Sequence, residues 1–435
     1  MMTYALEELV DTVDEIAETS FPDLEFLDPS GVLEVNARVS SVSTVRIELP
    51  SNEYFHLSSV QIDAEGVDDL VTATERVASS NWKGYGQLLA QGTLFDPDHR
   101  GTGFHTKKEQ FPWVEFRFDR PVELRRLRFR NRGNATALRA RGLRVRVRTA
   151  GGRWTTIYDG AERAQAFVRA TEGIFGGVHD VEAAEGGGVV PAAADLVQLL
   201  TQVHLREYGP ALVRDLAQIP ISPAARAQFR DLVSQKVLGR RELEWTSHGV
   251  RRSFRFWKPA EKERYVAYSM ELVADLRELT PHVCLGFGSV LAVVRDKDLI
   301  PHDDDLDIIV GFEPHEAAKI GDALRLIEKH LGARGYTVAG KNTAHRLVSR
   351  RPDKKVDVFV GIFEGDEIAW YPGRRGDLSR QIVFPAQEVE FLGTKCAIPA
   401  RAETYLERIY GPGWKVPDRH FKHTWDRRGY ADLIR

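Results

Sequence analysis

The spacing of apolar residues changes twice along this chain of 435 residues, and that change constrains the fold more than any other feature. Between about residues 31 and 176, short runs such as Leu124–Arg130 and Leu143–Thr149 alternate apolar and polar residues. Alternation with a period of two is typical of strands with one buried face, and several such runs between turn signals favour an antiparallel β-sandwich. Over residues 189–259 apolar residues recur at helical spacing instead, which predicts a helical connector.

After residue 260, candidate helices and short apolar strands alternate, as in an α+β domain. Three consecutive glycines at 186–188, followed by Pro191, are the best linker candidate. We therefore predict a multidomain chain with an N-terminal helical or irregular segment (1–30), an antiparallel β-sandwich (31–176), a helical connector (189–259) and a C-terminal α+β domain (260–435).

Composition excludes several classes of protein. The chain carries 60 Lys and Arg against 63 Asp and Glu, whereas a bulk nucleic-acid binder usually has a basic excess. Two cysteines are too few for a disulfide-built fold, and no apolar run approaches the roughly 20 residues that cross a bilayer. The first 25 residues lack the basic start and apolar stretch of a signal peptide. We expect a cytoplasmic protein without a transmembrane segment, which leaves peripheral association with the inner face of the membrane open.

The densest chemical signal is an acidic cluster before a predicted strand, Asp305–Val310. Four carboxylates fall within the five positions from Asp303 to Asp307. In an extended chain, alternate residues project from one face, so three of these acids would repel one another unless a cation lay between them. Hard divalent cations such as Mg²⁺ or Mn²⁺ take such oxygen ligands. The alternative is a solvated acidic turn, but burying an unpaired carboxylate beside Ile308 would cost several kcal/mol, which favours a ligand role.

A further carboxylate, Asp357, interrupts the apolar run Val356–Val360. If this strand pairs with the acidic one, its acid lies opposite Asp305 and Asp307, because neighbouring strands are only about 4.8 Å apart. Three carboxylates would then converge, as a two-metal phosphoryl-type site requires. The alternative is an acid paired with Lys354 or Lys355.

Small and basic residues lie near these acids in the sequence, and residues of these types can bind an anion such as a phosphate. The Gly288-Ser289 turn follows an apolar strand and precedes a helix, so its backbone N–H groups can approach a phosphate. Arg295 and Lys297 lie between this turn and the acids. Residues 247–257 interleave basic and aromatic side chains, including Arg251 and Arg252, and either grip a donor diphosphate or form a solvated amphipathic strand or loop.

These motifs resemble the nucleotidyltransferase-fold superfamily, in which a strand, a Gly-Ser turn, a helix, Asp-x-Asp on the next strand and a third Asp follow in order. The resemblance is closer still to its LicD branch, the phosphocholine transferases and their fukutin-like relatives. Residues 288–308 align with that family's long motif without a gap, with His302 in place of the usual Trp. Val356–Phe359 matches its later Val-Asp-Ile-Phe, and its closing Tyr-Gly-x-x-Trp-x-x-Pro matches residues 410–417.

The resemblance implies a nucleotidyltransferase fold for residues 260–435 and the transfer of a substituted phosphate from a CDP-linked donor to a sugar hydroxyl of a cell-surface or capsular glycan. The substituent is choline or an alditol such as ribitol or glycerol. It also implies that Mg²⁺ or Mn²⁺ is held by Asp305, Asp307 and Asp357. Asp303 is then the candidate base or a ligand of a second metal, with electrostatic support alone as the alternative. Donor contacts are expected from Gly288, Ser289, Arg295, Lys297, Arg251 and Arg252.

The front of the chain, from about residue 40 to 160, resembles a discoidin-like (coagulation-factor C-type) domain. The resemblance depends on Ala78–Trp82, Gly103–Thr106 and Pro112–Phe116. It implies glycan binding through loops at one end of the sandwich, with burial of the tryptophans in the core as the alternative. The candidate contacts to an acceptor glycan are Trp82, Tyr85, Phe104 and His105.

Two other functions stay open at this point. A nucleotidyltransferase acting on a small molecule would release pyrophosphate, whereas the LicD-type reaction releases CMP. A non-catalytic glycan-binding protein would carry an inactive transferase domain, although all three expected metal carboxylates are present in the sequence.

Overall fold

The computed structural model describes residues 3–99, 101–175, 180–182, 189–190, 193–246, 248–340, 344–351, 354–370, 373–419, 421, 423, 426 and 428–434. The glycine linker predicted at 186–188 lies outside these residues. The chain divides into two compact units, Met1–Arg241 and Glu242–Arg435. This boundary falls inside the predicted connector, so residues 242–259 belong to the second unit.

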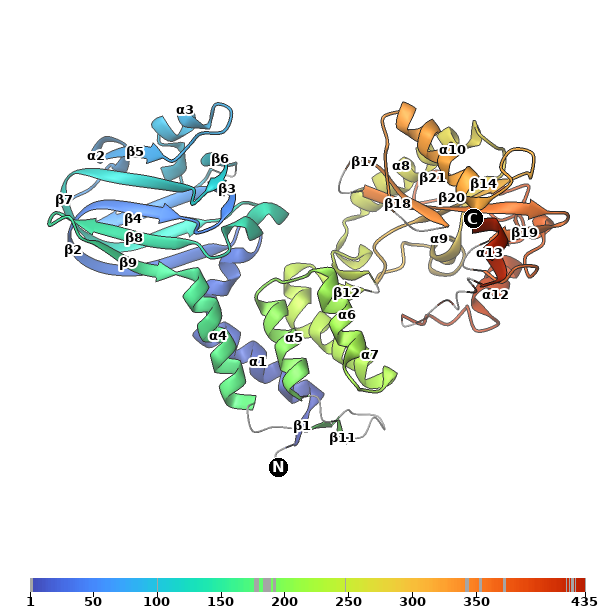
Figure 1. Ribbon diagram of the computed structural model, residues 1–435, viewed down its shortest axis with the longest axis horizontal. Coiled ribbons are helices and arrows are strands. Elements are labelled where there is room, and N and C mark those ends of the chain that lie inside the picture. Colours follow the sequence, from blue (N-terminus) through green and yellow to red (C-terminus); the bar gives the residue numbers. More distant parts are fainter. Residues whose placement is uncertain are drawn as a thin grey trace. The chain divides into compact units, whose positions relative to one another are not determined.

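The first unit contains antiparallel sheets, as the alternating pattern predicts (Figure 1). One sheet has the strand order β4-β7-β2-β8-β9, with β5 also paired to β7, and a smaller one joins β3 to β6. The strands are β2 (Val32–Glu48), β3 (Asn52–Leu57), β4 (Ser59–Ala64), β5 (Thr74–Ala78), β6 (Phe104–Gln110), β7 (Trp113–Arg130), β8 (Arg144–Thr149) and β9 (Trp154–Asp159). On β8, Val145 and Val147 are fully buried and the alternating arginines are partly exposed, which confirms the predicted alternation.

The predicted run Leu124–Arg130 is only the second half of a longer strand, β7. This strand continues through Pro121, which reads as a breaker in the sequence because proline lacks a backbone N–H. Pro121 falls where the pairing of β7 with β2 shifts register, between the pairs Val42–Val122 and Thr44–Arg117. A bulge leaves residues unpaired, so the missing donor is tolerated there.

Helices complete the first unit, and one of them corrects the predicted sandwich. Residues Gly160–Phe175, expected within the sandwich, form helix α4, whose buried residues Phe167, Thr171 and Phe175 recur every four positions. Three short strands, β1 (Thr3–Ala5), β10 (Asp180–Glu182) and β11 (Val189–Val190), form a further small sheet. The other α-helices of this unit are α1 (Leu6–Ser20), α2 (Leu70–Ala73), α3 (Tyr85–Ala90), α5 (Ala193–His204), α6 (Pro210–Gln218) and α7 (Pro223–Leu232).

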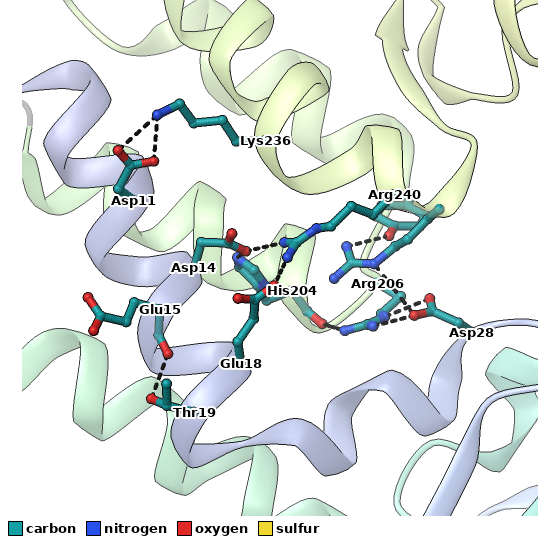
Figure 2. A network of polar contacts seen from close by, with 12 residues as sticks. Asp11, Asp14, Glu15, Glu18, Thr19, Asp28, His204, Arg206, Lys236 and Arg240 are labelled. Atoms are coloured by element: carbon teal, nitrogen blue, oxygen red, sulfur yellow. Dashed lines mark hydrogen bonds and ion pairs between the residues drawn. The ribbon is translucent and has the colours of Figure 1, made fainter.

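An ion-pair network joins α1 to the segments that follow α5 and α7 (Figure 2). The acidic face of α1 supplies Asp11, which lies 2.6 Å from the Lys236 ammonium. Deeper in the network, the Arg206 guanidinium lies 2.6 Å from an Asp28 oxygen, and only 2% of the Arg206 side chain is exposed. Arg241, 12% exposed, also lies 3.5 Å from Asp28. One carboxylate therefore serves two largely buried cations.

The second unit is built on a six-stranded mixed sheet of order β14-β15-β18-β17-β16, with β19 also paired to β18. Its strands are β14 (Val283–Leu285), β15 (Asp307–Phe312), β16 (Thr337–Ala339), β17 (His345–Arg351), β18 (Lys354–Glu364) and β19 (Glu367–Trp370). Two hairpins are added, β12 (Glu244–Thr246) with β13 (Gly249–Arg251), and β20 (Gln387–Phe391) with β21 (Thr394–Ile398). This mixture of strands and helices confirms the predicted α+β class.

The helices of the second unit are α8 (Pro259–Arg277), α9 (Phe287–Leu291), α10 (Ile320–Ala333), α11 (Arg380–Val383), α12 (Ala402–Tyr410) and α13 (Ala431–Ile434). The central strands are continuous apolar runs, and from Ile308 to Phe312 every side chain of β15 is buried. Such strands are covered on both faces, which makes them a rigid support for polar residues at their ends. Within the described part of the chain, no helix is both long and apolar enough to cross a membrane; the cytoplasmic location stays a prediction.

Candidate active site

Two acids lie side by side on neighbouring strands, Asp307 as the first residue of β15 and Asp357 as the fourth residue of β18. The predicted pairing of the two acid-bearing strands is confirmed: β15 and β18 are parallel, and Asp307 is the register partner of Asp357. Strand β15 begins at Asp307, two residues later than expected, so Asp305 lies in the loop that enters the strand. Both acids are thus at the same edge of a rigid sheet.

The predicted Gly288-Ser289 turn is instead part of helix α9 (Phe287–Leu291), whose single turn of helix is attached directly to this end of β15. The Gly286 N–H donates to the Asp307 carbonyl at 2.9 Å, and the Asp307 N–H donates to the Ser289 hydroxyl oxygen at 2.7 Å. A Cβ at Gly288 would lie 3.2 Å from Asp303 Oδ2 and 3.6 Å from Asp307 Oδ2. The backbone at Gly288 therefore faces two carboxylates with no side chain between them, and a larger residue at this position would crowd the carboxylates.

Burial and neighbouring negative charges raise the pKa of four acids, which are Asp303, Asp305, Asp307 and Asp357. Burial raises the pKa of Asp305 to about 6. Burial, followed by the charge of Asp305, raises the pKa of Asp357 to about 8. The same two causes, in the same order, raise the pKa of Asp303 and of Asp307 well above the usual carboxyl range. Asp357 is buried and the other three acids are partly buried, so protons or a bound cation would stabilise this cluster of carboxylates.

The β12–β13 hairpin, which was predicted to belong to the connector, contacts the acidic loop, which we define as residues 303–306 before β15. His248, at the tip of the hairpin, has its Nδ1 3.1 Å from Asp304 Oδ1 and 3.7 Å from Asp305 Oδ2. The hydrogen bond to Asp304 raises the pKa of His248 to about 10. Thr246 donates its hydroxyl to Asp304 at 3.3 Å. His248 was part of a recognised basic and aromatic segment, but its own role carried no signal in the sequence.

A second histidine lies beside the third acid. His345 Nε2 is 3.6 Å from Asp357 Oδ2, and burial lowers the pKa of His345 to about 4. The other oxygen, Asp357 Oδ1, is buried with no hydrogen-bond partner in the described residues. His345 follows a segment without a motif, so only the pairing of β17 with β18 reveals its place.

Of the four predicted donor-binding cations, only Arg251 contacts the acidic loop, with its Nε 3.8 Å from Asp304 Oδ2. Arg252 is bound to Glu261 at 3.0 Å. Arg295 is bound to Asp296 at 2.8 Å and donates to the Trp414 carbonyl at 3.1 Å. Lys297 is exposed and lines a cavity of about 470 Å³ with residues of β20, β21 and the first turn of α12; none of the four acids is among its described lining residues.

Comparison with known proteins identifies this part of the chain. The model of the family described as LicD/FKTN/FKRP, nucleotidyltransferase domain, matches residues 282–401. Residues 282–401, called the LicD-type domain below, are thus similar to the nucleotidyltransferase domain of a transferase family. Gly288, Ser289 and the four acids Asp303, Asp305, Asp307 and Asp357 all lie within the matched residues.

The related proteins cover only part of the chain. The ribitol-5-phosphate transferase FKTN of Mus musculus is 26% identical over 173 residues, which is 35% of this chain and 32% of that protein. The human ribitol-5-phosphate transferase FKTN is 26% identical over 164 residues, 33% of this chain and 30% of that protein. The chain thus spans about a third of the length of the curated relatives it matches.

Among solved structures, ANT(2")-Ia in complex with adenylyl-2"-tobramycin aligns with 14% identity and a TM-score of 0.24, over 32% of this chain and 70% of that one. A likeness this weak carries no argument. The LicD-type assignment therefore depends on the family match and on the order of the motifs.

The acids of the LicD-type domain have the donor chemistry of a divalent-metal site. Buried carboxylate oxygens are the ligands that Mg²⁺ and Mn²⁺ prefer, and Asp357 Oδ1 has no protein partner in the described residues. Across those same residues, however, no three His, Cys, Asp or Glu side chains already stand in a metal-binding group. The residue types and their burial fit a metal, whereas the ligand set is not fully assembled.

The predicted glycan contacts of the first unit are partly brought together. Trp82, Tyr85 and His105 gather with Tyr54, and the His105 ring centroid is 5.3 Å from that of Tyr85 and 5.7 Å from that of Tyr54. Trp82 and Tyr85 are partly exposed. Phe104 is fully buried and packs edge-on against another core ring, so the expectation that it contacts a glycan is wrong.

Proposed function

We propose that this chain transfers a substituted phosphate, with ribitol phosphate as the first candidate, from a CDP-linked donor to a sugar hydroxyl of a cell-surface or capsular glycan. The observation that carries the proposal is the register of Asp307 with Asp357 beside the Gly-Ser turn, inside the LicD-type domain. The FKTN relatives are ribitol-5-phosphate transferases, which supports an alditol phosphate over phosphocholine as the transferred group.

In the proposed reaction, the acceptor oxygen attacks the phosphorus that carries the alditol. The bond between that phosphorus and the oxygen of CMP breaks, and CMP leaves. Asp305, Asp307 and Asp357 would hold Mg²⁺ or Mn²⁺, which neutralises negative charge on the diphosphate when it is bound. Gly288 leaves room for the diphosphate beside the turn, and Arg251 contributes positive charge from the hairpin.

Asp303 is our candidate to accept the proton of the acceptor hydroxyl. Its Oδ2 faces the same uncovered backbone at Gly288 as Asp307 Oδ2, so a sugar hydroxyl at that point could reach both acids. Its alternatives remain a ligand role for a second metal or electrostatic support alone.

Donor turnover tests the reaction. The full chain is incubated with Mg²⁺, glycan acceptors and, separately, CDP-ribitol, CDP-glycerol, CDP-choline and CTP, while CMP and pyrophosphate are measured. We expect CMP from one CDP donor, and none from the Asp305→Ala Asp307→Ala double variant. Pyrophosphate from CTP would instead support nucleotidyl transfer. No turnover of any donor by a protein that still binds glycans would support the non-catalytic alternative.

We also propose that the first unit holds the acceptor glycan at the ring cluster of Tyr54, Trp82, Tyr85 and His105. His105 is only 8% exposed, so the contact to the sugar is expected from the partly exposed rings of Tyr54, Trp82 and Tyr85, whose faces can stack on sugars. Lys83 Nζ lies 5.3 Å over the Trp82 ring. Neighbouring positive charge would favour a glycan that already carries phosphate.

Trp82→Ala is expected to raise the KM for a polymeric acceptor by about tenfold, because one stacked ring contributes roughly 1 kcal/mol or more. The kcat and the KM for a short acceptor should stay unchanged. Trp154→Ala is the matched control, since Trp154 stacks on arginines of β2 and β8 instead. Equal effects of the two variants would contradict the proposed glycan site.

A further inference from the structure

A single buried hydroxyl joins the two acid-bearing segments. Tyr265 lies on α8, before the matched residues 282–401, and is 1% exposed. The Leu306 N–H donates to the Tyr265 hydroxyl oxygen at 3.1 Å. The same hydroxyl donates to the Lys355 carbonyl. Leu306 lies between Asp305 and Asp307, and Lys355 is two residues before Asp357.

The backbone around this hydroxyl leaves little freedom for either segment. The Leu306 carbonyl accepts a hydrogen bond from the Asp357 N–H at 2.9 Å, so the Leu306 peptide is fixed on one side by Tyr265 and on the other by β18. Because strand β15 begins only at Asp307, the bond to the Tyr265 hydroxyl is one of two that hold Leu306 just before the strand.

The Tyr265 ring is itself held in place. It packs against Phe254 and Trp257, with centroids 5.8 and 5.3 Å away. The Phe254 N–H in turn donates to the Asp303 carbonyl at 2.8 Å. Closely packed aromatic rings cannot shift without moving their neighbours, so the position of the Tyr265 hydroxyl relative to the acid-bearing segments is fixed.

We propose that Tyr265 is a positioning residue that sets the spacing of Asp305 and Asp307 relative to Asp357. Without the hydroxyl, the N–H of the buried Leu306 is left without a partner and the Lys355 carbonyl loses the same bond, so the residues before β15 can move away from β18. This inference deepens the proposed function and depends on it for the activity measurement. It does not depend on it for the binding of a cation by the acids.

The test compares Tyr265→Phe with Tyr268→Phe, both of which keep the ring. Tyr268 is on the same helix, but its hydroxyl accepts from the Arg350 N–H on β17. Mn²⁺ alone is titrated into the full-length proteins and followed by electron paramagnetic resonance, and kcat, KM and melting temperature are measured. We expect Tyr265→Phe to weaken Mn²⁺ binding and to lower kcat, each by about tenfold, with the KM for the acceptor unchanged. Tyr268→Phe should stay within about twofold of wild type in both.

The measurements distinguish failure of the proposed function from failure of the positioning role of Tyr265. If the wild type binds Mn²⁺ but turns over no CDP donor, the proposed function fails, and the Mn²⁺ titration still decides the role of Tyr265. If Tyr265→Phe binds Mn²⁺ and turns over donor like the wild type, or if Tyr268→Phe loses as much, the positioning role is overturned. A wild type without either property overturns both.

Discussion

Asp307→Asn is expected to lower CDP-donor turnover by about a thousandfold or more, while the metal-free protein stays at least as stable as the wild type. Removing a charge that holds a catalytic cation typically costs several kcal/mol of transition-state stabilisation, and about 4 kcal/mol corresponds to a thousandfold. Stability should not fall, because burial and the neighbouring acids already disfavour the ionised form of Asp307 and raise its pKa. The asparagine keeps the shape of the side chain and cannot ionise, so it matches the neutral form that the metal-free site favours.

The measurement is CMP release under saturating donor, together with melting temperature in the presence of a chelator. Asp298→Asn is the matched control, since Asp298 also carries one negative charge near the acidic loop but pairs with Lys262 at 2.6 Å. It should stay within about twofold of wild type, because a partly exposed pair contributes little. If Asp307→Asn keeps more than a tenth of the wild-type turnover, Asp307 is not a metal ligand.

Asp28→Ala should be the most destabilising change in the ion-pair network of the first unit. Asp28 is bound to Arg206, whose side chain is only 2% exposed, and lies 3.5 Å from Arg241. Breaking a buried pair leaves an uncompensated charge, which costs about 3–5 kcal/mol of the free energy of unfolding. The loss should appear in the unfolding of the first unit.

Denaturant unfolding followed by circular dichroism measures this loss, with the transitions of the two units fitted separately. Glu65→Ala is the control: Glu65 lies 2.8 Å from Arg125, but both side chains are more than half exposed. Such a surface pair contributes about 1 kcal/mol or less. Equal losses from the two variants would show that burial of Arg206 does not matter to the pair.

The candidate site was predictable where its functional residues lie close together in the sequence. The acids around Asp305 and the lone Asp357 each interrupt a characteristic local pattern, and the register of β15 with β18 follows once the two strands pair. Tyr265 and His345 were not predictable, because each acts through a contact with a residue distant in sequence. A tyrosine at an apolar position of a predicted helix indicates only a residue of the hydrophobic core.

Charge patterns were the least reliable guide. Arg252 and Arg295 appeared free to bind a donor phosphate, but both have acidic partners inside the second unit. Arg295 pairs with the very next residue, Asp296, which a pattern of unpaired charges does not reveal. Among residues 31–176, the continuity of β7 and the helix α4 were likewise not predicted. Pro121 indicates a break in a strand, and the predicted sandwich was extended to residue 176 from the alternating runs before residue 160.

The parallel pairing of β15 with β18 separates the acids from the chain that connects them. Asp307 and Asp357 are fixed by strand register, whereas α10, β16 and β17 lie between them in sequence. The register of the two acids does not depend on the length of the connection between α10 and β16, whereas β17 has to be kept, because it pairs with β18 and places His345 beside Asp357. Insertions between α10 and β16 should therefore be tolerated, and exchanges of β17 should disturb Asp357.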